Sequence, residues 1–118
     1  MSTVVTPSSV AELAGAVRAH EQVLAVGAST KARLSAVGDA YVRLSTKKLS
    51  GITEYEPDEY TFTALAGTPV REIAAALASK GQYLPFDPFL IDAGTTLGGT
   101  VAAGLSGPGR FRYGGLRD

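Results

Sequence analysis

The first hydrophobic pattern in the chain is helical. Four apolar residues recur at the spacing of one helical face: Val10, Leu13, Ala14 and Val17. Ser9 stands just before them and Glu12 follows three residues later, which matches a capping box. We therefore expect a helix that begins after Ser9 and ends near His20.

The next patterns predict strands. The apolar run 23–26 stops at Gly27 and is typical of a buried strand, and residues 41–44 alternate like a second one. Residues 52–56 and 60–65 flank the turn-forming sequence Pro57-Asp58-Glu59, which predicts a hairpin.

A second amphipathic helix is predicted after Thr68, with this threonine as the N-cap and Pro69 in the first helical position. Its apolar face consists of Val70, Ile73, Ala74 and Leu77, and Gly81 suits the C′ position. Beyond Gly81 the patterning fades, although residues 97–103 can form one or two helical turns. The fold class predicted from these elements is α+β, a small mixed sheet with two amphipathic helices.

The length and composition of the chain limit the classes of protein to which it can belong. A length of 118 residues fits one domain or part of one, and a hydrophobic share of 45% is ordinary for a globular chain. Eleven basic and eleven acidic residues argue against a surface dedicated to nucleic acid or anionic membranes. The absence of cysteine excludes disulfides and thiolate chemistry. With neither a signal peptide pattern nor a long apolar run, we expect a cytoplasmic location.

Candidate chemistry gathers in two glycine-containing segments. Residues 94–118 hold eight of the fourteen glycines, which suggests backbone amides presented to an anionic group. Upstream, the predicted strand 23–26 runs into Gly27-Ala28-Ser29-Thr30-Lys31, a small-residue turn with two hydroxyl groups and a cation. The turn matches neither a Walker A nor a Rossmann fingerprint. By itself it is either a phosphate cradle or an ordinary tight turn.

The order of these parts resembles the FAD-binding (PCMH-type) domain of the vanillyl-alcohol-oxidase superfamily. Within it, the chain is most similar to the FAD-binding subunits of bacterial glycolate oxidases. The resemblance runs from Val4 to Asp118. Its most specific pieces are Leu-Pro-Phe-Asp-Pro at 84–88, Thr-Leu-Gly-Gly-Thr-Val-Ala at 96–102 and Arg-Tyr-Gly-Gly-Leu-Arg-Asp at 112–118.

The resemblance implies a set of FAD contacts. The pyrophosphate turn would consist of Gly27, Ala28, Ser29, Thr30 and Lys31. The second phosphate and ribityl contact would come from Thr95, Thr96, Gly98 and Gly99, with Ala102 and Gly104 close to the flavin. Tyr113 and Gly114 would lie in a turn that leads back towards the cofactor.

Several features depart from the family pattern. Ala28 and Ser29 stand where glycine is common, and left-handed geometry there would cost about 1–2 kcal/mol per residue. Members that attach flavin covalently often use a histidine in this loop, whereas the single histidine here is His20. The resemblance therefore implies non-covalent FAD. Family members also continue beyond the equivalent of Asp118, so we expect residues 1–118 to be a partial FAD-binding domain.

The functional expectation is the FAD-binding portion of a flavin-dependent oxidoreductase that acts on a 2-hydroxy acid such as glycolate. No catalytic residue and no metal ligand set can be named, and the cofactor of a flavoenzyme carries the redox chemistry. Two alternatives stay open: a truncated non-catalytic remnant or interaction module with little flavin binding, and a module for a different nucleotide. Exposed apolar surface on a partial domain also predicts a partner chain or self-association.

Overall fold

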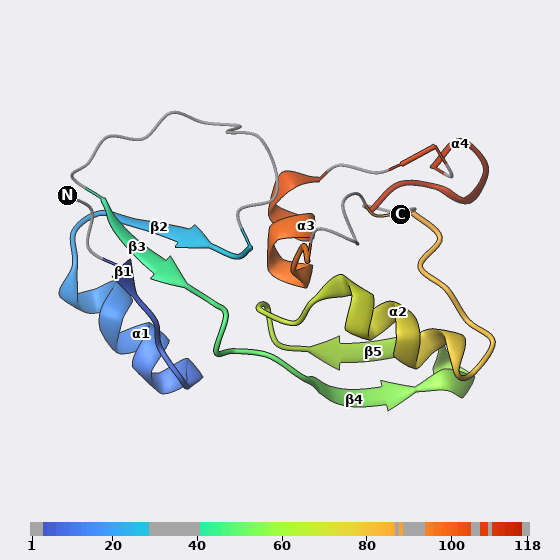
Figure 1. Cartoon of the computed structure of the whole chain (residues 1–118), viewed down its shortest axis with the longest axis horizontal. Helices are drawn as coiled ribbons and strands as arrows, with labels where there is room; N and C mark the ends of the chain where they lie inside the picture. The colour runs from blue at the N-terminus through green and yellow to red at the C-terminus, as the bar shows by residue number, and fades with distance from the viewer. Residues whose placement is uncertain are drawn as a thin grey trace.

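A computed structural model of the chain describes residues 4–28, 41–86, 88, 94–104, 107–108 and 110–116. Within these ranges, helices and strands form two small sheets with helices packed beside them (Figure 1). The predicted α+β class is confirmed. Both strand directions occur, and they are divided between a three-stranded sheet and a two-stranded one.

The three-stranded sheet is parallel. Its strands are β1 (Val4–Val5), β2 (Val23–Val26) and β3 (Val42–Ser45), in the order β1-β3-β2. The short β1 was not predicted, because two valines carry no periodicity. β2 begins and ends where its sequence pattern indicated, but it lies at the edge of the sheet and is only half-buried, with Ala25 exposed. The strand was therefore predicted correctly, but the prediction that it is buried was wrong.

Helix α1 (Val10–Ala19) follows β1 and ends at the C-cap His20, as predicted. The Ser9 hydroxyl accepts a hydrogen bond from the Glu12 amide at 3.1 Å, which confirms Ser9 as the N-cap. In a capping box the Glu12 side chain would accept from the Ser9 amide, and this contact differs from the prediction. The Glu12 carboxylate accepts from the Ser8 amide at 2.7 Å and the Ser8 hydroxyl at 2.8 Å, one residue before the cap.

This contact predicts a pH effect. The two hydrogen bonds from Ser8, and secondarily the charge of Lys48, lower the pKa of Glu12 below its ordinary value of 4.5. A carboxyl whose pKa is lower in the folded state adds stability above its unfolded pKa and loses it as pH falls through the folded value. Between about pH 6 and about pH 3, the Tm of the parent chain should fall more than that of Glu12→Gln. Parallel Tm curves across that range would contradict the role of Ser8.

The antiparallel hairpin is formed by β4 (Ile52–Glu56) and β5 (Thr61–Ala64), joined through a 3-10 turn at Pro57–Glu59. Its position and turn confirm the prediction. The hairpin is tied to the end of the following helix, because the Tyr55 hydroxyl donates to the Gln82 side-chain carbonyl. The Gln82 amide group in turn donates to the Pro57 carbonyl at 2.9 Å.

Helix α2 (Val70–Ala78) supplies the centre of the core. Val70 and Ile73 have no exposed surface and Leu77 is 5% exposed, as the predicted apolar face requires. The chain leaves α2 through a Schellman motif: Gly81 has φ +71°, its amide donates to Ala78, and the Gln82 amide donates to Leu77. Gly81 therefore has the C′ role expected of it.

The start of α2 corrects the sequence prediction. The N-cap is Pro69, and the Thr68 side chain caps nothing. The Thr68 hydroxyl is fully buried and turns back towards the hairpin: it accepts from the Gly51 amide at 2.9 Å and contacts the Leu65 carbonyl at 2.6 Å and the Gly51 carbonyl at 3.2 Å. Thr68 thus joins both ends of the hairpin to the start of the helix.

Candidate functional site

The candidate site lies where the end of β2 meets α3 (Leu97–Ala103), the helix predicted at 97–103. In Figure 1, α3 stands between the tip of β2 and the layer formed by β5 and α2. Backbone hydrogen bonds hold its first turn there. The Leu97 amide donates to Thr68 at 2.8 Å, the Gly98 amide to Ala66 at 2.8 Å, and the Thr95 carbonyl accepts from Val70 at 2.9 Å.

Two glycines of the site are required by close packing. A Cβ on Gly27 would lie 2.4 Å from the Thr96 hydroxyl oxygen, and one on Gly98 would lie 2.9 Å from the Ala66 Cβ. Neither glycine has a positive φ, so space is the constraint at both positions. The Gly27 contact shows that the two glycine-containing segments, about seventy residues apart in sequence, meet in the folded chain.

The backbone donors of the two segments differ in availability. In the first turn of α3, the amides of Leu97 and Gly98 bond to protein carbonyls and the Gly99 amide bonds to the Thr96 hydroxyl at 3.1 Å. In contrast, neither Gly27 nor Ala28 donates its amide to an acceptor among the residues that the structure describes. The β2 loop therefore has backbone amides that are free to donate hydrogen bonds to an anion. The small residues of α3 allow a ligand to come into van der Waals contact with its backbone.

The other predicted contacts lie around this point. Ala28 is exposed and its φ is not positive, so it does not have the left-handed geometry that would strain a non-glycine residue. Thr95 and Thr96 are buried. Ala102 and Gly104 are exposed, and Gly104 ends α3 in the left-handed conformation, with φ +66°. Three predicted contacts, Ser29, Thr30 and Lys31, lie outside the described residues.

The C-terminal contacts are described in part. Tyr113 is the last residue of α4 (Arg110–Tyr113), and Gly114 follows it with φ +93° and is half-buried. A positive φ directly after a helix is the geometry that glycine provides, which accounts for Gly114 in structural terms. That either residue approaches the cofactor stays a prediction.

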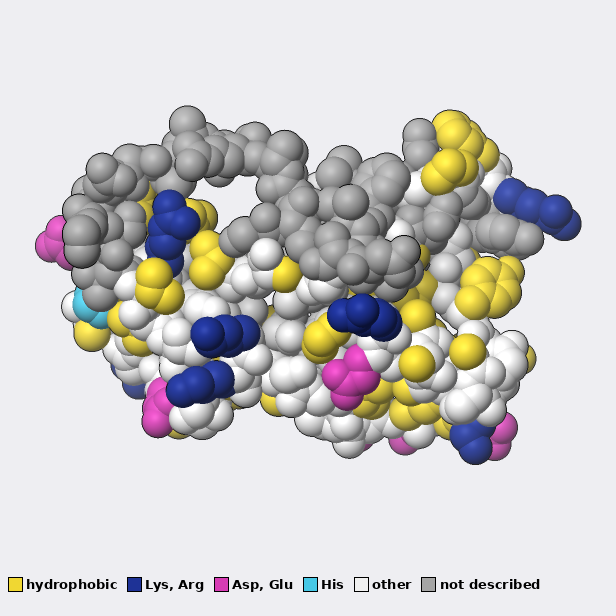
Figure 2. Space-filling view, viewed as in Figure 1, with side chains coloured by type: hydrophobic (Ala, Val, Ile, Leu, Met, Phe, Trp, Pro, Cys, Tyr) yellow, Lys and Arg dark blue, Asp and Glu magenta, His cyan; other side chains and the backbone are white. Residues whose placement is uncertain are grey.

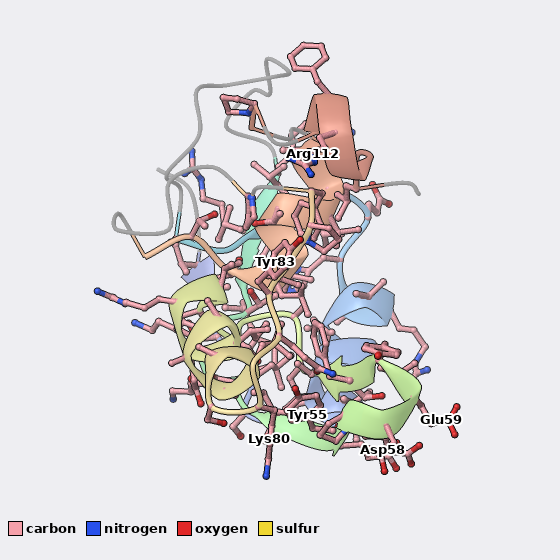
Figure 3. The ribbon with its side chains drawn as sticks, turned by 90° about the vertical axis from the view of Figure 1, so that its right-hand side faces the viewer. Tyr55, Asp58, Glu59, Lys80, Tyr83 and Arg112 are labelled. Carbon is pink, nitrogen blue, oxygen red and sulfur yellow. The ribbon has the colours of Figure 1, made fainter. Side chains whose placement is uncertain are left out.

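The acidic side chains of the hairpin lie away from the site. Asp58 and Glu59 project from the end of the hairpin, at the opposite side from α3 (Figure 3), and Glu54 and Glu56 are also exposed. The described residues hold no group of three side chains able to ligate a metal. On the face in Figure 2, apolar side chains lie in several places between charged ones. The described ranges contain no helix with the length and apolar character to cross a membrane.

Thr100 is a residue that the sequence did not single out. It lies one helical turn after Thr96, is fully buried, and its hydroxyl has no hydrogen-bond partner within the described structure. A threonine in an apolar helical segment has no sequence signal that distinguishes this state from a hydroxyl bonded to the preceding turn. A buried polar atom without a partner opposes folding.

Removing that hydroxyl should stabilise the chain. Thr100→Val keeps the branched shape and removes the unpaired oxygen, so we expect the free energy of unfolding to rise by about 1 kcal/mol. Thr100→Ser is the matched variant, because it keeps the hydroxyl and loses a buried methyl group, and should destabilise. Urea unfolding of the three proteins measures both changes. A valine variant less stable than the parent would show that the hydroxyl has a partner in solution.

Comparison with protein families decides the identity of this fold. A family model described as "FAD binding domain" matches residues 1–118, the whole chain. The chain belongs to the FAD binding domain family. The resemblance inferred from its motifs is confirmed, and FAD is the cofactor of this family.

Individual relatives agree. The chain is 48% identical over 68 residues to the glycolate oxidase subunit GlcE of Escherichia coli (strain K12), a match that covers 58% of this chain and 19% of that protein. Two crystal forms of alkyldihydroxyacetonephosphate synthase match its fold with a TM-score of 0.79 at 24% identity, over 98% of this chain and 23% of theirs. The chain thus spans about a fifth of the length of these relatives.

The residues at the meeting of β2 and α3 fit an extended cofactor. The loop end offers the amides of Gly27 and Ala28, and the adjoining α3 carries the small residues Gly99, Ala102 and Gly104 as well as the exposed Val101. A Cβ on Gly104 would meet nothing within 4 Å, so the end of α3 is open. Small residues at these positions allow a phosphate group or a flat ring system to approach the main chain closely.

Proposed function

We propose that the chain holds the pyrophosphate of FAD at the end of β2 and the ribityl–flavin half along α3. The contact between Gly27 and Thr96 supports this assignment, since it places the loop with available amides beside the glycine-containing start of α3. In this assignment the two segments have different roles. The β2 loop supplies donors to the phosphates, and α3 supplies a surface of small residues.

The binding proposal has a direct test. The purified chain is soaked with FAD, desalted, and its visible absorbance spectrum recorded. A retained flavin band is expected, and acid precipitation should release all of it, because His20 lies at the end of α1 and no histidine occurs in the loop at 27–31. Flavin that stays with the acid precipitate would contradict non-covalent attachment. A colourless protein after desalting would contradict the proposed function.

The proposed reaction is oxidation of a 2-hydroxy acid such as glycolate. It is supported by the 48% identity to a glycolate oxidase subunit over 58% of the chain. When bound, the FAD cofactor would supply the two-electron oxidising chemistry that this reaction needs. In this proposal the residues of this chain bind and orient the cofactor.

The substrate proposal is tested on the FAD-loaded protein without oxygen. Added glycolate should bleach the flavin absorbance, whereas acetate, which lacks the hydroxyl group, should leave it unchanged. If another 2-hydroxy acid bleaches the flavin and glycolate does not, the substrate is a different member of the same class. If no hydroxy acid bleaches a protein that retains FAD, the proposed reaction is wrong although the cofactor assignment holds.

We also propose that a further protein surface covers α1 and β1. Val10 of the apolar α1 face is 63% exposed, Val17 is 46% exposed, and Val4 is 58% exposed, so the sheet leaves these residues uncovered. Exposed valines of this kind favour association with a partner chain or a second copy. Light scattering should show oligomers of the isolated chain. A monodisperse monomer at high concentration would contradict self-association.

The non-catalytic alternative rests on one observation. The first-turn amides of α3 already bond to protein acceptors, which removes donors that the sequence had suggested for the cofactor. A scaffold that keeps the fold and binds little flavin would have the same geometry. It predicts a folded chain that shows no flavin band after soaking, so the absorbance test separates the two.

A further inference from the structure

Gly27 faces a fixed obstacle. A Cβ at this position would lie 2.4 Å from the Thr96 hydroxyl oxygen and 3.4 Å from both Thr96 Cβ and Thr96 Cγ2. The first distance is far below a van der Waals contact, and the other two are ordinary contacts. The side chain excluded at residue 27 is therefore excluded by one oxygen atom.

That oxygen is held in place by its own hydrogen bond. The Thr96 hydroxyl accepts from the Gly99 amide at 3.1 Å and caps α3, and the residue is only 6% exposed. The flanking backbone is fixed as well, since Thr96 pairs with Pro69 and the Leu97 amide bonds to Thr68. Rotation of the Thr96 side chain away from Gly27 would break the cap.

We propose that Thr96 is a positioning residue for FAD, whose hydroxyl, seated against Gly27, sets the spacing between the β2 loop and α3. This inference rests on the proposed FAD binding. The amides assigned to the pyrophosphate begin at Gly27 itself, so a shift of that backbone displaces the donors. The resemblance implied a direct cofactor contact for Thr96, whereas the geometry assigns its hydroxyl to the contact between the two segments.

The test is a double-mutant cycle on FAD affinity. Gly27→Ala alone should weaken FAD binding by about tenfold or more, because the new methyl group pushes the loop away from α3. Thr96→Ala removes the obstructing oxygen and leaves the Thr96 Cβ at 3.4 Å. In that background the added Gly27→Ala should change the dissociation constant by less than about twofold, the limit for independent sites. FAD fluorescence titration of the four proteins measures the cycle.

Two further variants make the result specific. Thr96→Ser keeps the oxygen, so Gly27→Ala should stay damaging in the serine background. Gly15→Ala is the control for adding a methyl group, since nothing lies within 4 Å of a Cβ at Gly15 in α1, and FAD affinity should be unchanged. Additive effects of Gly27→Ala and Thr96→Ala would overturn the proposal.

The Tm of each variant without FAD separates the possible failures. Rescue of both Tm and FAD affinity in the double variant supports the positioning role. Rescue of Tm with no recovery of affinity would mean that the contact is structural and does not position the cofactor, which overturns the proposal and leaves FAD binding intact. If the parent chain binds no FAD, the proposed function fails together with the cofactor role, and the Tm cycle alone then reports whether the contact exists.

Discussion

Gly67→Ala is expected to destabilise the chain by about 3 kcal/mol or more, at the upper end for overpacked sites. A Cβ at this position would lie 1.9 Å from the Thr46 carbonyl oxygen and 2.6 Å from the Leu49 carbonyl oxygen. Both obstacles are backbone atoms, so no side-chain rotation relieves the clash. The Gly67 amide also donates to Leu49 at 2.7 Å, and the displacement needed to admit a methyl group would break that bond.

Gly15→Ala is the matched control for this prediction. The added methyl group meets no atom within 4 Å, and alanine in a helix is favoured over glycine by about 0.5–1 kcal/mol. Urea unfolding should therefore show opposite signs for the same chemical change. If both variants lose a similar amount of stability, the close approach of Gly67 to the 46–49 turn does not exist in solution.

Thr68→Val is expected to cost about 3 kcal/mol, because its hydroxyl contacts are lost and the Gly51 amide is left without its acceptor. The Gly51 amide loses its acceptor, and the Leu65 carbonyl loses the hydroxyl that lies 2.6 Å away. Valine keeps the shape of the side chain, so packing at this fully buried position is preserved. The loss is therefore assigned to the hydrogen bonds.

Thr68→Ser is the rescue variant, because it restores the hydroxyl and removes only a methyl group. We expect its free energy of unfolding to lie between that of the parent chain and that of the valine variant. The Tm of the three proteins, measured by circular dichroism, gives the order. A valine variant as stable as the parent would show that Thr68 does not join the hairpin to α2.

Much of the fold was predictable because its determinants are local. The Ser9 cap, the extent of β2 and the hairpin around Pro57–Glu59 each depend on residues within a few positions of one another. The apolar face of α2 and the exit at Gly81 follow from helical periodicity and from one glycine conformation. Patterns of this length are visible in a single sequence.

The errors arose where a distant segment decides the outcome. Thr68 has the chemistry of an N-cap, yet its hydroxyl bonds to Gly51 and contacts Leu65, because the hairpin lies against it. At Ala28 the sequence left open strain from left-handed geometry or a loop of different shape, and the φ of Ala28 is not positive. At both positions the sequence is compatible with more than one local conformation. Contacts with distant segments determine which of them forms.

The candidate site was likewise predictable where its signals are local and unpredictable where distant contacts decide. The motifs identified the family and its cofactor, and the family match confirms both. Which amides are available could not be predicted, since the donors of Leu97 and Gly98 are taken by carbonyls of the segment 66–68, far upstream in sequence.

The sequence by itself determined the α+β class, the position of each main helix and strand, and membership of an FAD-binding family, because periodicity, caps and motif order are properties of neighbouring residues. The tertiary structure alone decided that Gly27 meets Thr96 and that Gly67 must lack a side chain. A glycine in a sequence signals freedom of the backbone or lack of space. Only the folded chain, by bringing distant atoms together, shows that space is the constraint at these two positions.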